Sequence, residues 1–346
     1  MASINEDLIR KVFDEMLKHK ASLSKMVLTD EDEGDLPDYR ILADLIIKNF
    51  PWPVGVELRR LFSGSMRQLD RMRLDQIFKT IERSMQFLSF VMLSQLSKMC
   101  EEGSIKISES FAKEFKNRFL VLSLGNYSWM IRAMGNMFSS QKIEWFMPEL
   151  SGCCDDKFYA ALDFWVPERN EIGHYQINLT QEEIEKRCVE YEEKLTFILS
   201  RISFLAKYRL VSVKEIKVFK SKMTKASFHH IFDLLNSSDS DFKANEFDES
   251  TYTDSHSVLL LKSIKSIDTY LNLSPLIIDT STEILDSKEK FDIKKDIFMY
   301  SKFRNDQLMY LGTEVTEKVD LRSLKNYDIL LTEFRQMVSL ISPGAL

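Results

Sequence analysis

The run of apolar residues that follows Thr180 restricts the fold more than any other feature of the chain. Thr180-Gln181-Glu182-Glu183 matches a capping box, in which the threonine hydroxyl accepts a hydrogen bond from a backbone N–H and the glutamate reaches back. The residues that then recur at spacings of three and four are Ile184, Cys188, Tyr191, Leu195, Ile198, Ile202 and Leu205. They predict a long amphipathic helix, whose apolar seam packs either inside a bundle of this chain or against its counterpart in a second subunit.

Similar spacings predict helices over much of the chain before this point. Glycine supplies the positive-φ positions of tight turns, and only 10 of the 346 residues are glycine. That share is about 3%, under half the usual share of about 7%, and it favours helices over a large sheet. The other ranges expected to be helical are 5–27, 39–50, 54–62, 66–100, 111–124, 128–138 and 155–165.

The pattern changes after residue 236. Residues 236–257 are rich in Ser, Thr, Asp and Glu with little apolar content, which indicates a linker. Beyond it, β-branched and aromatic residues predict strands at 258–264, 267–273, 297–303 and 307–311. We expect Arg304-Asn305-Asp306 at the tip of a hairpin that joins the last two strands, and a closing helix over 321–341.

Charge and cysteine content narrow the class of protein. The formal net charge of −6 argues against a protein that coats nucleic acid over its whole surface, although it leaves room for a local cationic site. The spacing of the four cysteines suggests neither a disulfide framework nor a zinc site, so we expect no metal and no cofactor. With no targeting segment or membrane-length apolar stretch in view, we expect no contact with a membrane and a cytoplasmic location.

One short segment carries residues suited to RNA chemistry, Arg169-Asn170-Glu171-Ile172-Gly173-His174. An arginine is a permanent, planar, bidentate donor for phosphate, and a histidine exchanges a proton near neutral pH. In metal-free RNA cleavage a base deprotonates the 2′-hydroxyl, the oxygen attacks the adjacent phosphate, and a cation stabilises the developing charge. The alternative is that Arg169 and His174 only cap helix ends and pair with nearby acids such as Glu168 or Glu171.

The spacing within this segment predicts its local geometry. We expect Pro167 to open a new helical turn after the helix at 155–165, and Gly173 to end that turn. Asn170 and His174 are four residues apart and share a face of a helical turn, where the amide can orient the imidazole.

The segment resembles the signature of the HEPN superfamily, an arginine, very often followed by asparagine, with a histidine four to six residues further on. The resemblance covers residues 75–208. It implies a helical domain that dimerises, so that two copies of the motif form a metal-independent ribonuclease site. It also implies that Arg169 binds the scissile phosphate, that His174 acts as general acid or base, and that Asn170 supports them. Such proteins are common in prokaryotic toxin–antitoxin, CRISPR-linked and antiphage systems, and many keep only the dimer.

These features together predict a mainly α fold, a HEPN-like helical bundle with extra N-terminal helices and a small C-terminal α+β module. The expected parts are an N-terminal helical region at 1–74, the HEPN-like domain at 75–235, the linker at 236–257 and the α+β domain at 258–346.

A second cationic segment precedes the predicted bundle. Residues 59–73 contain five arginines and no lysine. Arg60, Arg67 and Arg71 would share one face if the segment were a continuous helix, which would form a surface for the RNA backbone. Ser63-Gly64-Ser65 interrupts the segment. The alternative is pairing with neighbouring acids, namely Glu57, Asp70 and Asp75.

Two functions of different classes fit the sequence. The first is a metal-independent endoribonuclease of a prokaryotic defence or toxin system, acting on RNA as a homodimer. The second is a non-catalytic HEPN-like adaptor or sensor subunit, which dimerises and binds a protein partner in a defence complex. A plain helical scaffold, in which the motif is accidental, is the third and simplest interpretation.

Overall fold

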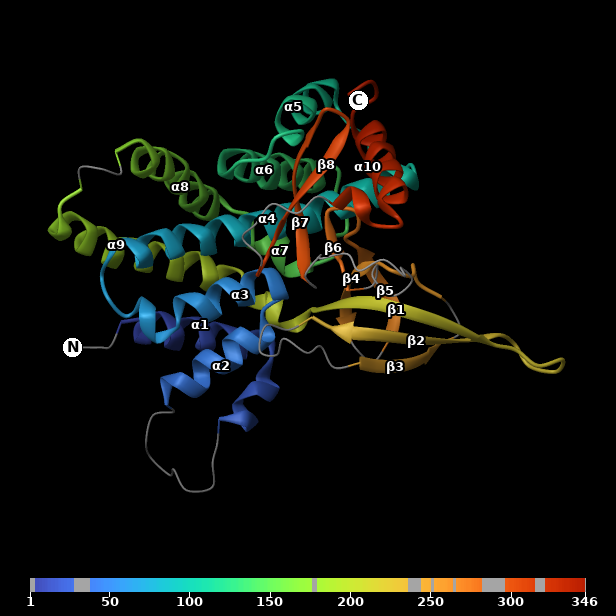
Figure 1. The fold of residues 1–346 in the computed structure, drawn as a ribbon, viewed down its shortest axis with the longest axis horizontal. Helices are drawn as coiled ribbons and strands as arrows, with labels where there is room; N and C mark the ends of the chain where they lie inside the picture. The colour runs from blue at the N-terminus through green and yellow to red at the C-terminus, as the bar shows by residue number, and fades with distance from the viewer. Residues whose placement is uncertain are drawn as a thin grey trace. The chain divides into compact units, whose positions relative to one another are not determined.

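The computed structural model describes residues 4–27, 38–175, 179–235, 244–249, 252–263, 266–281, 296–314 and 321–345 (Figure 1). These residues form two compact units, each discontinuous in sequence. Unit 1 contains the residues up to Phe87 together with Met147–Tyr208, and unit 2 contains Leu88–Phe146, Arg209–Leu235 and the described residues that follow. This division differs from the linear order of domains that the sequence suggested.

Unit 1 consists of helices in the part of the chain that the structure describes. They are α1 (Glu6–His19), η1 (Ala21–Met26), α2 (Tyr39–Asn49), α3 (Trp52–Leu61), η2 (Gly64–Met66), the first half of α4 (Arg71–Glu101), α7 (Pro148–Cys153), α8 (Asp156–Tyr175), α9 (Gln181–Arg201) and η3 (Ser203–Lys207). Every range in this unit that the apolar spacing marked as helical contains a helix.

The apolar seam of α9 is buried within the chain. The capping box is present, because the Glu183 backbone N–H donates to the Thr180 hydroxyl at 3.3 Å and the Thr180 N–H donates to the Glu183 carboxylate at 2.8 Å. All the seam residues from Cys188 onward are at most 1% exposed, and α9 contacts α1 and α8. The seam therefore packs inside the bundle and is not available to a second subunit.

An aromatic cluster holds three helices of unit 1 together. Phe78 of α4 and Phe164 and Trp165 of α8 each make an edge-to-face contact with Tyr191 of α9, with ring centroids 5.5, 5.6 and 5.5 Å away. Trp165 is fully buried. Such edge-to-face pairs fix ring orientation as well as burying area, so the cluster fixes how α8 lies between α4 and α9.

A buried ion pair joins the start of the chain to α4 and α9. The Arg73 side chain is 0% exposed and donates to Glu192, to Asn5 Oδ1 at 2.8 Å and to the Met66 carbonyl at 2.7 Å. Asn5 in turn donates its backbone N–H to Glu192 at 3.1 Å and its amide to the Leu61 carbonyl at 3.1 Å. A buried arginine is tolerated when its charge is paired in this way, although Nε of Arg73 has no partner among the described residues.

Unit 2 contains two antiparallel sheets, which corrects the predicted mainly α fold. The five-stranded sheet has the order β3-β2-β1-β4-β5 and the three-stranded sheet the order β6-β7-β8. The strands are β1 (Arg209–Phe219), β2 (Ser227–Leu234), β3 (Ala244–Glu249), β4 (Val258–Ser263), β5 (Ser266–Asn272), β6 (Ile277–Asp279), β7 (Ile297–Arg304) and β8 (Gln307–Gly312). The helices of unit 2 are the second half of α4, α5 (Glu109–Phe119), α6 (Leu124–Ser140), η5 (Leu321–Ser323) and α10 (Tyr327–Ile341). The chain thus has a mixed α/β fold.

The strands β1 to β3 lie where a helical domain and a linker were expected, and a β-bulge explains part of this error. Val211 and Val213 alternate on one face of β1, but the register shifts between Val213 and Glu215, and Ile216 and Val218 continue after the shift. A bulge inserts one residue and breaks the period of two. The low glycine content also led to the prediction of few strands, and this inference fails because residues other than glycine can occupy turn positions.

The hairpin of β7 and β8 shows this directly. Asn305 and Asp306 have φ angles of 51° and 62°, the left-handed conformation that a two-residue hairpin turn requires and that asparagine and aspartate tolerate. The predicted tip is confirmed, as are the four strands β4, β5, β7 and β8, each within a residue or two of its expected bounds.

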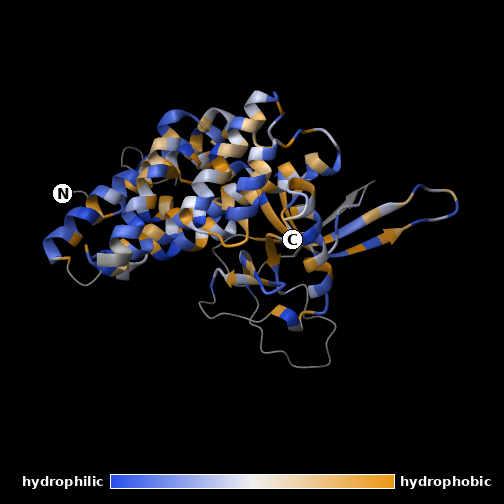
Figure 2. Cartoon of the chain, turned by 90° about the horizontal axis from the view of Figure 1, so that it is seen from above, coloured by the Kyte–Doolittle hydropathy of each residue, from blue (hydrophilic) through white to orange (hydrophobic). Residues whose placement is uncertain are grey.

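Hydrophilic and hydrophobic residues are interspersed along the helices (Figure 2). Within the described ranges, no helix combines the length and the apolar character that crossing a bilayer requires.

Replacing Arg73 by alanine tests the role of the buried ion pair. Removal of one partner leaves Glu192 partly buried without its cation, so we expect a loss of about 3–5 kcal/mol in the free energy of unfolding. Lys18→Ala is the control, because Lys18 forms an exposed pair with Glu15 and should cost less than about 1 kcal/mol. Urea unfolding curves measure both, and equal losses for the two variants would contradict the assignment.

Candidate functional site

The Arg169–His174 segment lies at the end of one continuous helix. α8 runs from Asp156 to Tyr175 with Pro167 inside it, so Pro167 does not open a separate turn and Gly173 does not end one. Both local expectations were wrong. Proline lacks an amide hydrogen and removes one backbone hydrogen bond, but the packing of Trp165 in the aromatic cluster holds the helix together on the preceding turn.

Arg169 is exposed and bound to an acid of a neighbouring helix. Half of its side chain is exposed, and Nε and Nη2 lie 3.2 and 3.1 Å from one carboxylate oxygen of Glu82 on α4. Asn170 is exposed as well. The backbone of His174 is helical, one turn after Asn170, which keeps the two positions on one side of α8; the side chain of His174 lies outside what the structure describes.

The acids next to Arg169 pair with a different arginine. Arg187 of α9 lies 2.7 Å from Glu171 and 3.7 Å from Glu168, and the Tyr191 hydroxyl donates to Glu168. Burial, followed by the contact with Glu168, raises the pKa of Tyr191 well above its usual range. The end of α8 is therefore a charged network in which Glu82, and neither Glu168 nor Glu171, pairs with Arg169.

The arginine-rich segment is divided among α3, η2 and the start of α4, so helical spacing does not place its arginines on one face. Arg60 lies 2.9 Å from Glu57 and Arg71 3.1 Å from Asp75, as the pairing alternative predicted. Arg67 donates to the Tyr39 hydroxyl at 3.2 Å.

Arg67 also lines a cavity of about 200 Å³ in unit 1. Arg40 and Arg59 line the same cavity, together with Tyr39, Ser63 and Asp44. Sequence reasoning missed Arg40, which lies at the start of α2 and well before the arginine-rich segment, and it did not select Arg59. Three arginines against one aspartate make this cavity suited to an anion the size of phosphate.

The thiols are poorly suited to nucleophilic chemistry at neutral pH. The four cysteines are free, and burial raises the pKa of Cys153 to about 12 and that of Cys100 to about 11. Neither is a thiolate at neutral pH. Over the described stretches, no group of three or more His, Cys, Asp or Glu residues is arranged to hold a metal ion.

Comparison of the chain with protein-family models, with curated proteins and with solved structures gives no match. The resemblance to the HEPN signature therefore rests on the residues of the motif alone.

The Arg169–Glu82 pair is exposed, and its contribution to folding should be small. We expect Arg169→Ala to lower the free energy of unfolding by less than about 1 kcal/mol, and a double-mutant cycle with Glu82→Ala to give a coupling of about 0.2–1 kcal/mol. Urea unfolding of the two single variants and the double variant measures both. A loss as large as that expected for Arg73→Ala would show that Arg169 is a structural residue.

Proposed function

We propose that the chain is a HEPN-like ribonuclease that cleaves RNA without a metal, as a dimer, in a prokaryotic defence or toxin system. The observation that carries the proposal is the exposed position of Arg169 and Asn170 at the end of α8, with His174 one helical turn further on the same helix. A long RNA can reach such residues, which it could not do in a closed pocket. We assign the activity to the cytoplasm.

In this proposal Arg169 exchanges one anionic partner for another. A carboxylate oxygen already binds two of its donors, and a phosphodiester, also a monoanion, offers two oxygens to the same donors and gains negative charge in the transition state. The guanidinium would then hold the scissile phosphate, while His174 takes the proton from the 2′-hydroxyl as general base or gives a proton to the leaving oxygen as general acid. Asn170 would support the imidazole or its counterpart in the second subunit.

Outside the motif, Arg71 and the arginine cavity both support an extended contact with RNA. Arg71 and Glu82 are eleven residues apart on α4, which places them on one face at a separation of about 16 Å along the helix axis. Arg169 is bound to Glu82, so Arg71 and Arg169 follow the same face of α4. The arginine cavity of Arg40, Arg59 and Arg67 belongs to the same unit.

Cleavage of labelled single-stranded RNA in the presence of EDTA tests the proposal. We expect the wild-type chain to cleave, and Arg169→Ala and His174→Ala each to lower the rate by about 100-fold or more, because each removes a group needed in the transition state. Arg118→Ala is the matched control, since Arg118 is also exposed and paired with a glutamate. An inactive wild type, or variants that cleave as fast as it does, would refute ribonuclease activity.

The salt dependence of RNA binding tests the arginine cavity. If Arg67 contacts a phosphate, Arg67→Ala should weaken binding and reduce the slope of log K against log salt concentration by about 0.7, the value for one contact with a single strand. Fluorescence anisotropy with the catalytically impaired His174→Ala chain measures this without cleavage. Lys18→Ala should leave the slope unchanged, and an unchanged slope for Arg67→Ala would remove this cavity from the RNA path.

The second candidate, a non-catalytic adaptor or sensor subunit, is favoured by one observation. Arg169, Arg187 and the acids around them form ion pairs across α4, α8 and α9, and such a network can hold an interface without any chemistry. This candidate predicts that Arg169→Ala changes self-association or partner binding and leaves no RNA cleavage to lose. Light scattering after size-exclusion chromatography tests the dimer that both candidates share, and a monomer would contradict both.

A further inference from the structure

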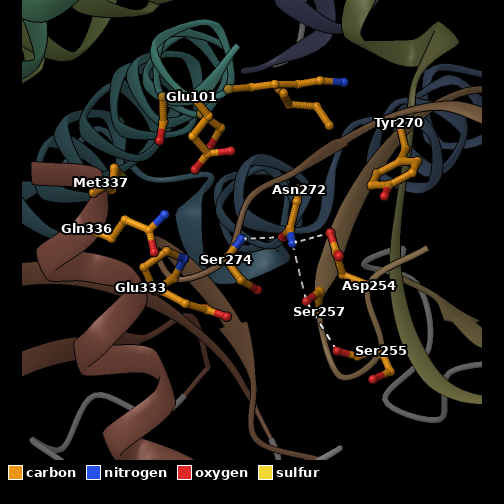
Figure 3. A pocket seen from close by; sticks show the side chains of 15 residues that line it. Glu101, Asp254, Ser255, Ser257, Tyr270, Asn272, Ser274, Glu333, Gln336 and Met337 are labelled. Atoms are coloured by element: carbon orange, nitrogen blue, oxygen red, sulfur yellow. Dashed lines mark hydrogen bonds between the residues drawn. The ribbon is translucent and has the colours of Figure 1, made fainter. Parts of the chain in front are cut away.

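Unit 2 contains a polar cavity of about 540 Å³, within the range of about 300–1,000 Å³ that small-molecule sites span. Its walls come from the C-terminal half of α4, the segment before β4, β5 and α10 (Figure 3). The charged residues in its lining are Lys98, Glu101, Asp254 and Glu333. All of these elements belong to unit 2, so the cavity is complete within one compact body.

The charges around this cavity are not balanced. Three carboxylates against one ammonium leave a formal charge of −2 when all four groups are ionised. Partial desolvation, followed by repulsion from Asp254, raises the pKa of both Glu101 and Glu333 above the usual range. A carboxyl group whose ionised form is disfavoured in this way gains stability when a cation binds beside it.

Two serines that are almost fully buried contribute hydroxyls to the lining of the cavity. Ser94 is 6% exposed and Ser97 is 9% exposed. In the part of the chain that the structure describes, neither hydroxyl makes a hydrogen bond. Both hydroxyls are open to the cavity, and a bound molecule with N–H groups would supply donors to both. They are an observation independent of the carboxylates that also points to a ligand.

The opposite side of the cavity is held in place by an amide. Asn272 Nδ2 donates to Asp254 Oδ2 at 2.9 Å and to the Ser257 hydroxyl at 3.4 Å, and Asn272 Oδ1 accepts from the Ser274 N–H at 2.9 Å. Figure 3 shows Glu333 on α10 across the cavity from Asp254. The carboxylates therefore face the space from different walls, and Asp254 is fixed before any ligand binds.

We propose that this cavity binds a small organic dication, a molecule with ammonium or guanidinium groups at its two ends. The charge of such a molecule complements the excess of carboxylates, and its ends can reach walls that lie apart. A metal ion fits the cavity less well, because the acids do not form a cluster with the geometry of metal ligands within the described residues.

Calorimetry with the full chain at pH 7.5 and 150 mM NaCl tests this proposal, with agmatine and putrescine as probes. Sorbitol serves as a neutral probe and MgCl₂ as an inorganic dication. We expect saturable binding of at least one organic cation, weakened about tenfold by Glu101→Gln and again by Glu333→Gln, since each removes one charge-assisted hydrogen bond. Glu114→Gln is the control, because Glu114 is an exposed acid of α5 in the same unit.

The glutamine variants should fold, since they remove charges that repel each other. Their thermal midpoints without ligand should equal or exceed that of the wild type, which circular dichroism measures. If a variant fails to fold, Asp254→Asn takes its place in the binding test. The proposal is overturned if neither organic cation binds saturably, if sorbitol or Mg²⁺ binds as tightly, or if the glutamine variants bind as well as the Glu114→Gln control.

The dependence of binding on pH gives a second measurement of the same site. Because the pKa of Glu101 and that of Glu333 are raised, protonation at pH 5 removes negative charge that is present at pH 7.5. Lys98, Asp254 and Tyr270 also face the cavity. Binding of agmatine should therefore tighten several-fold from pH 5 to pH 7.5, and equal affinity at the two values would contradict a role for these carboxylates.

Discussion

The buried pair of Arg73 and Glu192 is the interaction on which the arrangement of unit 1 depends. It places a full positive charge where water does not reach, and that is tolerable only while Glu192, Asn5 and the Met66 carbonyl all keep their positions. Those partners come from α9, from the start of the chain and from the segment before α4. Displacing α9 would leave the charge of Arg73 without its counter-ion, and displacing either of the other two elements would leave one of its donors without an acceptor. The pair therefore constrains the relative register of these elements more than it adds net stability.

The position of the candidate site follows from this constraint and from the aromatic cluster. α4 and α9 are fixed against each other, and Trp165 and Phe164 then fix α8 between them. The end of α8 extends beyond the aromatic contacts, which leaves Arg169 and Asn170 exposed on a helix that is anchored one turn earlier. A site for a long substrate requires this combination of a fixed backbone and exposed side chains. The fold supplies it whether or not catalysis takes place there.

The sequence predicted what local periodicity controls and failed where distant contacts decide. The Thr180 cap, the buried seam of α9 and the turn at Asn305 were all predictable, because each depends on neighbours within a few residues. The pairing of Arg169 with Glu82 was not, since the two are far apart in sequence and nearer acids were available. Likewise Arg40 joins Arg67 in one cavity only through the packing of helices. The five-stranded sheet was missed because a bulge hid the alternation in β1.

The small free energy of the exposed pair between Arg169 and Glu82 bears on the role of Arg169. An exposed pair of this kind contributes at most about 1 kcal/mol, so a phosphate that forms a bidentate contact can displace Glu82 at little cost. A pair that existed to hold α8 in place would be expected to be buried, as that of Arg73 is, because only burial makes the loss of one partner severe. The exposure of Arg169 therefore favours a residue that changes partners. A residue that changes partners is what a phosphate-binding site on α8 requires.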